Sequence, residues 1–317
     1  MASSVSSSPG VASSASSSPG VASSASSSPG VGRGPVIVGV DGGDSARDAL
    51  ALGTWAAEVL GAPLVVAVVH PAPAALGSGR VDAEWVAARH EAARQVLDGA
   101  RAVVEGAAEY RTVASSSAAH GLHDLAEELA AALIVVGSGR SGPRSRLFAG
   151  STADRLLAGS VCPVAVAPTG MERPPGTLSR IGVAYVDTLD GRAALATAHA
   201  LAARTKTPVR LVTVVADADS TLPFLVGQDA ERAFLETARE TYEQALTQAA
   251  ATVTAAPADW EIRTGDVVDQ LAELDDVDVL VCGSRGYGPA RRVLLGGVSA
   301  RLVRRARRPV VVVPRSG

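Results

Sequence analysis

Two kinds of hydrophobic pattern alternate along the chain from Val36 onward. Short runs rich in Val, Ile and Ala, such as Val36–Val40 and Leu64–Val69, predict buried strands. Longer segments between these runs carry apolar residues three and four positions apart, as in residues 45–60, and predict amphipathic helices. Because strands alternate with helices, the pattern favours parallel βαβ units with right-handed crossovers.

This alternation runs through the chain twice. The predicted strands lie near residues 36–40, 64–69, 110–114, 133–136 and 164–167, and again near 181–185, 209–215, 260–263, 279–282 and 310–313. The predicted helices lie near residues 45–60, 81–106, 122–131 and 151–158, and again near 192–203, 228–251, 267–274 and from 298. Asp44 and Ser45 are expected to cap the first helix, and Gly61 to end it. Each half therefore predicts a five-stranded α/β sandwich.

Composition divides the chain into four segments. Residues 1–32 repeat SSSPG every ten residues, and Ser, Ala, Gly and Pro bury too little apolar surface to order a chain. We expect a disordered tail there, a first domain over 33–169, a linker over 170–178 and a second domain over 179–317. The tail has neither the basic start nor the apolar centre of a secretory signal.

Composition also limits the class of protein. Only 3% of residues are aromatic, against 47% hydrophobic, so Val, Leu, Ala and Ile must build the cores. A net charge of -3 gives no general attraction to nucleic acid or to an anionic membrane. Cys162 and Cys282 lie in apolar runs and are interpreted as core residues. No apolar run reaches the roughly 20 residues of a membrane span, and we expect a cytoplasmic protein.

A glycine-rich loop follows the fourth strand of each half. The later copy, residues 279–299, reads VLVCGSRGYGPARRVLLGGVS, and the earlier copy, residues 133–153, reads LIVVGSGRSGPRSRLFAGSTA. Glycines let the backbone approach an anion closely, and the N–H groups at the start of a helix point toward it. A strand, a glycine loop and a helix in this order predict an anion-binding site, and the repetition indicates a duplicated unit.

These features make the chain resemble the universal stress protein family from Val36 to Pro314. The resemblance depends on VGVDGGDSARDAL after the first strand and on the two glycine loops, each followed by an apolar closing strand. The family signature is Gly, two residues, Gly, nine residues, Gly and then Ser or Thr. The resemblance implies an α/β fold with two flavodoxin-like, Rossmann-like sandwiches, each with a parallel sheet in the order 3-2-1-4-5. Ligands of such sheets bind beyond the carboxyl ends of strands 1 and 4.

The resemblance further implies a nucleotide site, which the first half matches in part. In family members that bind ATP, an aspartate after strand 1 contacts the nucleoside and the loop holds the phosphates. Arg140 stands where the signature has its second glycine, with Gly139 one residue earlier. The implied ligand-binding residues of the first half are Asp41, Gly137, Gly139, Arg140, Gly150, Ser151 and Thr152.

The second half matches the signature better and the aspartate position worse. Gly283, Gly286 and Gly296 all fit, but Gly297 stands at the Ser/Thr position, leaving Ser299 as the nearest hydroxyl. Val186 stands at the aspartate position, with Asp187 one residue later. We therefore favour the first half as the nucleotide site, although binding in the second half or in neither stays open.

The function implied is that of a stress or dormancy regulator that binds ATP, with or without Mg²⁺, and is not an enzyme. Slow ATP hydrolysis would not be its function, because family members usually carry no hydrolytic base. One alternative is a nucleotide-free interaction protein with degenerate loops. Another is an enzyme that adenylates a substrate, whose SGGxDS loop is only partly echoed by residues 41–45.

Partners follow from the same resemblance. Single-unit members pair through their last strands, so residues 164–167 and 310–313 are expected to pair within this chain as a pseudo-dimer. A homodimer of the whole chain and an unidentified regulatory protein are further expected partners. The arginines between Arg291 and Arg308 favour a solvated helix face beside a phosphate site over a nucleic-acid surface, because aromatic stacking residues are missing.

Overall fold

A computed structural model describes six parts of the chain. These are residues 34–72, 83–139, 152–171, 176–215, 228–284 and 297–314. The predicted disordered tail lies outside the described residues, as do most of both glycine loops. In residues 228–236 and 238 only the backbone is described.

The described elements alternate between strand and helix in both halves. Unit one contains β1 (Val36–Gly39), α1 (Ser45–Leu60), β2 (Leu64–Pro71), α2 (Ala83–Arg101), β3 (Ala108–Ser115), α3 (Ala118–Glu128), β4 (Leu133–Gly137), α4 (Thr152–Gly159) and β5 (Val164–Ala167). Unit two contains β6 (Ile181–Ala184), α5 (Leu189–Thr205), β7 (Val209–Val215), α7 (Gln228–Ala251), β8 (Ala258–Thr264), α8 (Val267–Ala272), β9 (Val279–Gly283), α9 (Val298–Arg305) and β10 (Val310–Val313).

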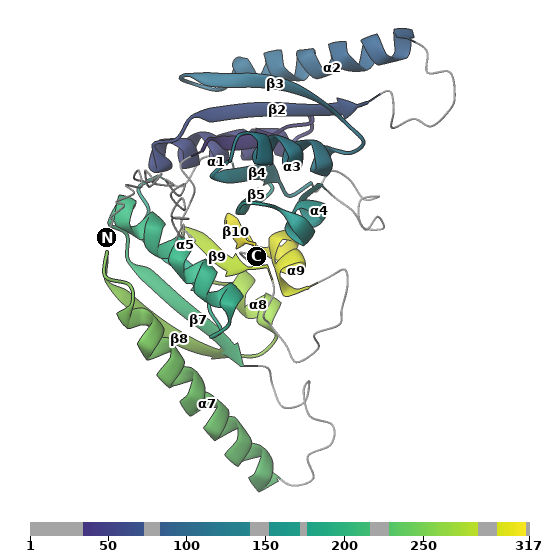
Figure 1. Ribbon diagram of the computed structural model, residues 1–317. Helices are drawn as coiled ribbons and strands as arrows, with labels where there is room; N and C mark the ends of the chain where they lie inside the picture. Colours follow the sequence, from purple (N-terminus) through teal and green to yellow (C-terminus); the bar gives the residue numbers. More distant parts are fainter. Residues whose placement is uncertain are drawn as a thin grey trace, which may run out of the picture.

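All strands belong to one ten-stranded sheet in the order β3-β2-β1-β4-β5-β10-β9-β6-β7-β8 (Figure 1). Each unit contributes a parallel set in the predicted order 3-2-1-4-5, which confirms the fold class. β5 and β10 pair antiparallel at the centre, with Val310 opposite Val166 and Val312 opposite Val164. The predicted pairing of the two closing strands is thus confirmed, and each covers an apolar edge of the other.

Helices cover both faces of this sheet, and the apolar core divides accordingly. On one face, side chains from α3, α4, α8 and α9 form a single cluster that runs across both units. On the other face, α1 and α2 cover unit one, and α5 and α7 cover unit two. The last turn of α5 reaches across, where Arg204 Nη1 donates to Leu60 O over 2.6 Å. The two units therefore share the core on one face of the sheet, whereas on the other face each unit has a core of its own.

The first helix begins differently from the prediction. Asp44 occupies the position before α1, but it has helical backbone angles and its side chain makes no capping hydrogen bond. Asp41 is the residue whose carboxylate serves the turn, because Oδ1 accepts a 2.9 Å bond from Gly43 N. The predicted side-chain cap at Asp44 is therefore wrong, and the bond from Asp41 fixes the turn before the helix. Gly61 ends the helix as expected, in the left-handed conformation with φ 57°.

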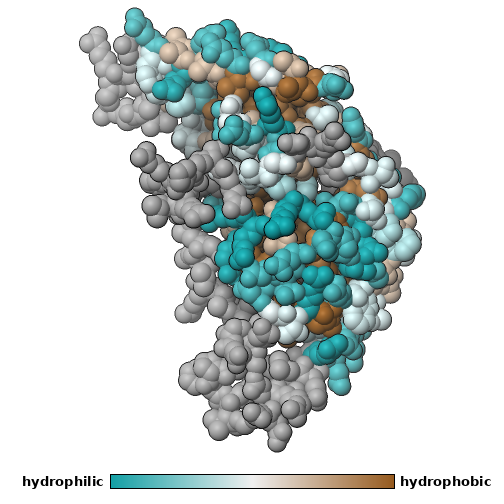
Figure 2. Space-filling view, turned by 180° about the vertical axis from the view of Figure 1, so that it is seen from behind, coloured by the Kyte–Doolittle hydropathy of each residue, from teal (hydrophilic) through white to brown (hydrophobic). Residues whose placement is uncertain are grey.

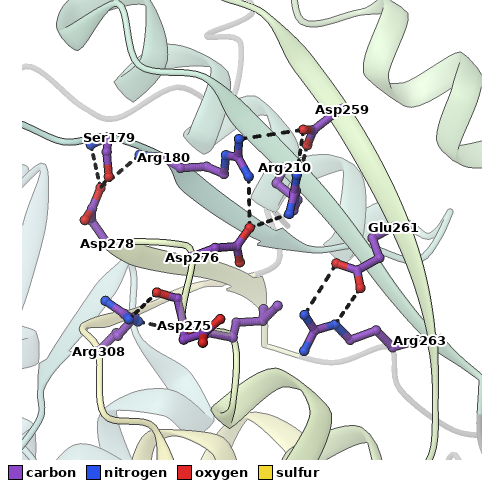
Figure 3. A network of polar contacts seen from close by, with 11 residues as sticks. Ser179, Arg180, Arg210, Asp259, Glu261, Arg263, Asp275, Asp276, Asp278 and Arg308 are labelled. Atoms are coloured by element: carbon purple, nitrogen blue, oxygen red, sulfur yellow. Dashed lines mark hydrogen bonds and ion pairs between the residues drawn. The ribbon is translucent and has the colours of Figure 1, made fainter.

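Ionic contacts join the amino ends of the strands in unit two (Figure 3). Arg210 binds Asp259 through Nε and Nη2 at 2.9 and 2.8 Å, and its Nη1 also pairs with Asp276. Arg180 Nη1 donates to the same oxygen of Asp276 over 2.9 Å. Arg308 bonds the carbonyls of Leu274 and Asp275 below them. These contacts connect β6, β7, β8 and the loop before β9.

Ser179 and Asp278 extend this arrangement. One oxygen of Asp278 accepts bonds from Ser179 N at 2.5 Å, Ser179 Oγ at 2.7 Å and Arg180 N at 2.9 Å. Burial opposes the charged form, but these bonds outweigh it and hold the pKa of the Asp278 carboxyl below its usual value. Hydrogen bonds from Arg210 likewise lower the pKa of Asp259, against partial burial.

The exterior gives no sign of a bilayer-spanning element. Among the described residues, no helix combines the length and apolarity needed to cross a membrane. Hydrophilic side chains predominate on the face shown in Figure 2, and hydrophobic ones appear there in smaller, separate areas.

Candidate functional site

The carboxyl end of β1 in unit one carries the predicted aspartate on a tight turn. Asp41 is exposed, and the following Gly42 has φ 81°, a backbone conformation that disfavours any side chain. One oxygen of Asp41 is held by Gly43 N at 2.9 Å. For the other oxygen, no partner is found among the described residues. The turn thus fixes a carboxylate at this edge while leaving half of it free to accept a further hydrogen bond.

The end of β4 lies directly beside this turn. Val36 is opposite Leu133 in the parallel ladder, so the register brings Gly137 next to the residues that follow β1. A Cβ at Gly137 would lie 2.5 Å from the carbonyl oxygen of Ser45, at the start of α1. Gly139 then takes φ 65°, and nothing lies within 4 Å of the Cβ it lacks. Gly137 is thus required by packing, whereas Gly139 supplies a left-handed turn facing open space.

Thr152 begins α4, whose first turn stands behind the loop. Thr152 is half-buried and Asp154 lies in the same turn. Arg140, Gly150 and Ser151 lie outside the described residues. The structure therefore brings together Asp41, Gly137, Gly139 and the start of α4 at the switch point between β1 and β4. This is where an open α/β sheet offers a crevice to a ligand.

Asp48 is a residue that the sequence analysis missed. It is 7% exposed on α1, and its Oδ2 accepts a 3.0 Å hydrogen bond from Gly170 N, just past the end of β5. This bond anchors the segment after β5 beside the site. The sequence shows a carboxylate in the first turn of a predicted helix, but it shows neither the burial of this carboxylate nor its distant partner.

In unit two the corresponding position is closed by an ion pair. Ile181 occupies the same position relative to β7 and β9 as Val36 occupies relative to β2 and β4, so Val186 corresponds to Asp41. Arg192 binds Asp187 with Nε to Oδ1 at 2.7 Å and Nη2 to Oδ2 at 3.1 Å. Tyr185 OH also donates to Oδ1 over 3.2 Å. The bonds from Arg192 lower the pKa of Asp187, and both oxygens of this carboxylate are committed within the protein.

Two more of the residues predicted for the site in unit two make close contacts within the protein. A Cβ at Gly283 would lie 2.7 Å from Asp190 Cβ, so this glycine is needed for packing against α5. Ser299 is 9% exposed and its Oγ donates to Gly283 O over 3.0 Å. Gly286 and Gly296 lie outside the described residues. The Ser299 hydroxyl therefore joins the start of α9 to the end of β9.

Neither cysteine has the environment of a nucleophile. Burial raises the pKa of Cys162 to about 11 and that of Cys282 to about 12, so both thiols stay protonated near neutral pH. Across the described parts of the chain, no group of three or more His, Cys, Asp or Glu side chains is arranged to hold a metal ion. The described residues at the edge of unit one offer hydrogen-bonding groups, those of Asp41 and of the backbone near Gly139.

Comparison with known proteins identifies the relatives of this chain. The family model for the universal stress protein family matches residues 32–168 and 177–314. A universal stress protein of Mycobacterium tuberculosis H37Rv is 31% identical over 299 residues, covering 88% of this chain and 99% of the relative. The crystal structure of a universal stress protein from Archaeoglobus fulgidus covers 91% of this chain and 99% of its own, with 17% identity and a TM-score of 0.62.

One shorter structure was solved with a nucleotide. It is a universal stress protein from Archaeoglobus fulgidus in complex with dAMP, with 28% identity and a TM-score of 0.31. It covers 42% of this chain and 96% of its own. The match of the family model to both halves, together with the mycobacterial relative, places the whole duplication within one family. This chain belongs to the universal stress protein family, as a member with two family domains in tandem.

Proposed function

We propose that this protein binds one adenine nucleotide, ATP, at the carboxyl edge of unit one and acts as a stress or dormancy regulator rather than as an enzyme. One observation carries the proposal. Among the described residues, one oxygen of Asp41 in unit one has no partner, whereas Arg192 bonds both oxygens of Asp187 in unit two. A free carboxylate oxygen can accept hydrogen bonds from the hydroxyl groups of a ribose.

The surrounding backbone supports a nucleotide of this kind. Gly139 has a left-handed turn facing open space, and the start of α4 follows the loop. Backbone N–H groups in such positions favour phosphate oxygens. Asp41 would hold the nucleoside, and Gly137, Gly139 and Thr152 would border the phosphates. The described residues at this edge include no positioned nucleophile, which favours binding without turnover.

Isothermal titration of the full chain with Mg-ATP tests this proposal. The wild-type protein is expected to bind one equivalent per chain. Asp41→Ala should weaken binding at least about tenfold, because it removes the carboxylate that accepts hydrogen bonds from the ribose. No other group of the turn can take its place. Asp187→Ala is the matched control, since it removes a carboxylate at the same edge of unit two and should change the affinity less than twofold.

Three results would contradict the proposal. Absence of heat above the dilution background in the wild type would instead favour a nucleotide-free interaction protein. A larger loss in Asp187→Ala than in Asp41→Ala would move the site to unit two. Sustained release of phosphate or pyrophosphate from ATP, at rates of an ordinary enzyme, would overturn the non-catalytic role.

A further inference from the structure

A polar pocket lies where the two units meet, at the carboxyl end of β5. It has a volume of about 350 Å³. Unit one contributes Ser138, which follows β4, and Pro168 and Thr169, which follow β5. Unit two contributes residues 303–307, from the last turn of α9 and just beyond. This space is called the seam pocket below.

The antiparallel pairing of β5 and β10 explains why α9 reaches unit one. Because Val310 lies opposite Val166, the start of β10 is beside the end of β5. The chain enters β10 from the last turn of α9, which is therefore carried to the carboxyl edge of unit one. Arg304 in that turn forms an ion pair with Asp154 in the first turn of α4. The end of α9 thus lies against the beginning of α4, the helix that follows the glycine loop.

The lining of the seam pocket is suited to phosphate. Ser138 Oγ and Thr169 Oγ1 lie 2.8 Å apart, so one of these hydroxyls donates to the other and the pair keeps a proton for a ligand. Arg304 and Arg305 pair with Asp154 and Asp269. Arg307 is exposed, and no partner is found for its guanidinium among the described residues. A guanidinium beside hydroxyl groups recognises phosphate oxygens by charge and by hydrogen bonds.

The basic side chains are present on one side of the seam only. Val164 of β5 corresponds to Val310 of β10, so Arg304, Arg305 and Arg307 correspond to Ala158, Gly159 and Val161. The end of α4 therefore presents no cation to the carboxyl edge of unit two. The arginines at and just after the end of α9 therefore lie at the carboxyl edge of unit one, the same edge as Asp41. Two independent differences between the units thus point to the same half.

We propose that the seam pocket receives the distal phosphates of a nucleotide bound in unit one, and that Arg307 thereby favours ADP and ATP over AMP. This inference rests on the proposed function. Strand spacing of about 4.8 Å puts the end of β5 roughly 10 Å from the end of β1, because β4 lies between them. A nucleoside at Asp41 would place its first phosphate near β4 and the later ones beyond it. The second unit then completes a site that belongs to the first.

Titration of ATP, ADP and AMP into full-length variants at fixed ionic strength tests the inference. Arg307→Gln is expected to weaken ATP and ADP binding about tenfold and AMP binding less than twofold, because only the longer chains reach the pocket. Arg301→Gln is the matched control. It removes the same charge from α9, at an exposed residue outside the lining of the seam pocket, and should leave all three affinities within twofold.

The outcomes separate this inference from the proposed function. If the wild type binds none of the three nucleotides, the proposed function fails. If the wild type binds ATP but Arg307→Gln behaves like Arg301→Gln, or loses AMP as strongly as ATP, the inference fails while nucleotide binding stands. Arg307→Lys should recover part of the ATP affinity, and equal melting temperatures would show that the variants are folded.

Discussion

The two units carry the same fold and share the glycine that ends β4 and β9, yet their carboxyl edges differ. In unit one the aspartate after β1 is held by a single backbone bond, and in unit two Arg192 occupies both oxygens of Asp187. Gly137 is required by close contact with the first turn of α1, and Gly283 by close contact with the first turn of α5. The comparison teaches that the glycines at the ends of β4 and β9 report packing between strand and helix. The state of the neighbouring side chains is what distinguishes an available site from a closed one.

The amino edges differ in the opposite sense. Unit two has the ionic contacts of Arg180 and Arg210, whereas Pro35 and Val65 occupy the corresponding positions in unit one. The same backbone bond is present in both, from Ala132 N to Pro35 O and from Asp278 N to Arg180 O, each at 2.9 Å. Unit two thus has more ionic contacts at its amino edge, whereas unit one has the available carboxylate at its carboxyl edge.

Replacing the two shared glycines should have the largest effect on this comparison. Gly137→Ala places a Cβ within 2.8 Å of Ser45 at the start of α1, and Gly283→Ala places one within 2.8 Å of Asp190 in the first turn of α5. Each is expected to lower the free energy of unfolding by about 1–3 kcal/mol through overpacking. Urea unfolding of both variants checks this loss.

Added ATP then separates the two glycine variants. Gly283→Ala should gain as much melting temperature from saturating ATP as the wild type, because its defect lies outside the bound edge. Gly137→Ala should gain less, since the displaced first turn of α1 adjoins Asp41. Equal gains in both variants would contradict a site confined to unit one. Gly99→Ala is a suitable control, because nothing lies within 4 Å of the added Cβ.

Removing the central cation of the amino edge should have the next largest effect. Arg210→Met leaves Asp259 without its two-bond partner and removes one partner of Asp276. The expected loss is about 1–2 kcal/mol in the free energy of unfolding, since the side chain is only 23% exposed. Hydrogen exchange should show faster opening in β7 and β8 while β2 and β3 keep their protection. Arg239→Met, which breaks an exposed pair with Glu243, should cost less than about 0.5 kcal/mol.

Asp278 makes the amino edge of unit two sensitive to acid. Its folded pKa lies below the usual aspartate value of 3.8, so the carboxylate stabilises the fold above that pH. This contribution is lost as the pH falls through the folded pKa. Asp278→Asn is expected to be less stable than the wild type by about 1 kcal/mol at pH 7, and the difference should shrink below about pH 4. Urea unfolding at several pH values measures it, and a constant difference down to pH 3 would contradict this cause.

The fold could be predicted almost entirely from the sequence, because most strands are apolar runs between helical patterns. The two outer strands, β3 and β8, have mixed polar sequences and are indicated mainly by their place in the repeated order. The order of the strands and the pairing of β5 with β10 came from the family resemblance and agree with the structure. The cap at Asp44 was wrong because this residue has helical backbone angles, φ -58° and ψ -36°, instead of the extended ones of a capping residue. Residue types alone do not fix such backbone angles.

The candidate site was less predictable for a different reason. The sequence shows which residues stand at the signature positions, but not which of them are already bonded within the protein. Arg192 was counted only as the start of a helix, and Ser299 only as a spare hydroxyl. The seam pocket joins residues more than 130 positions apart, so no local motif could indicate it. It arises from the β5–β10 pairing, whereas the bonds of Arg192 and Ser299 arise from contacts within unit two.

Opening the ion pair of unit two should have the smallest effect. Arg192→Gln frees Asp187, and because both side chains are about half exposed to water the loss of stability should be smaller than in Asp278→Asn. We expect no second nucleotide to bind, since Val186 still stands at the aspartate position and the Ser299 hydroxyl still bonds Gly283 O. Isothermal titration should therefore give one ATP per chain, as in the wild type. A second equivalent in Arg192→Gln would mean that this pair alone closes unit two, and that the units differ by one contact rather than by several.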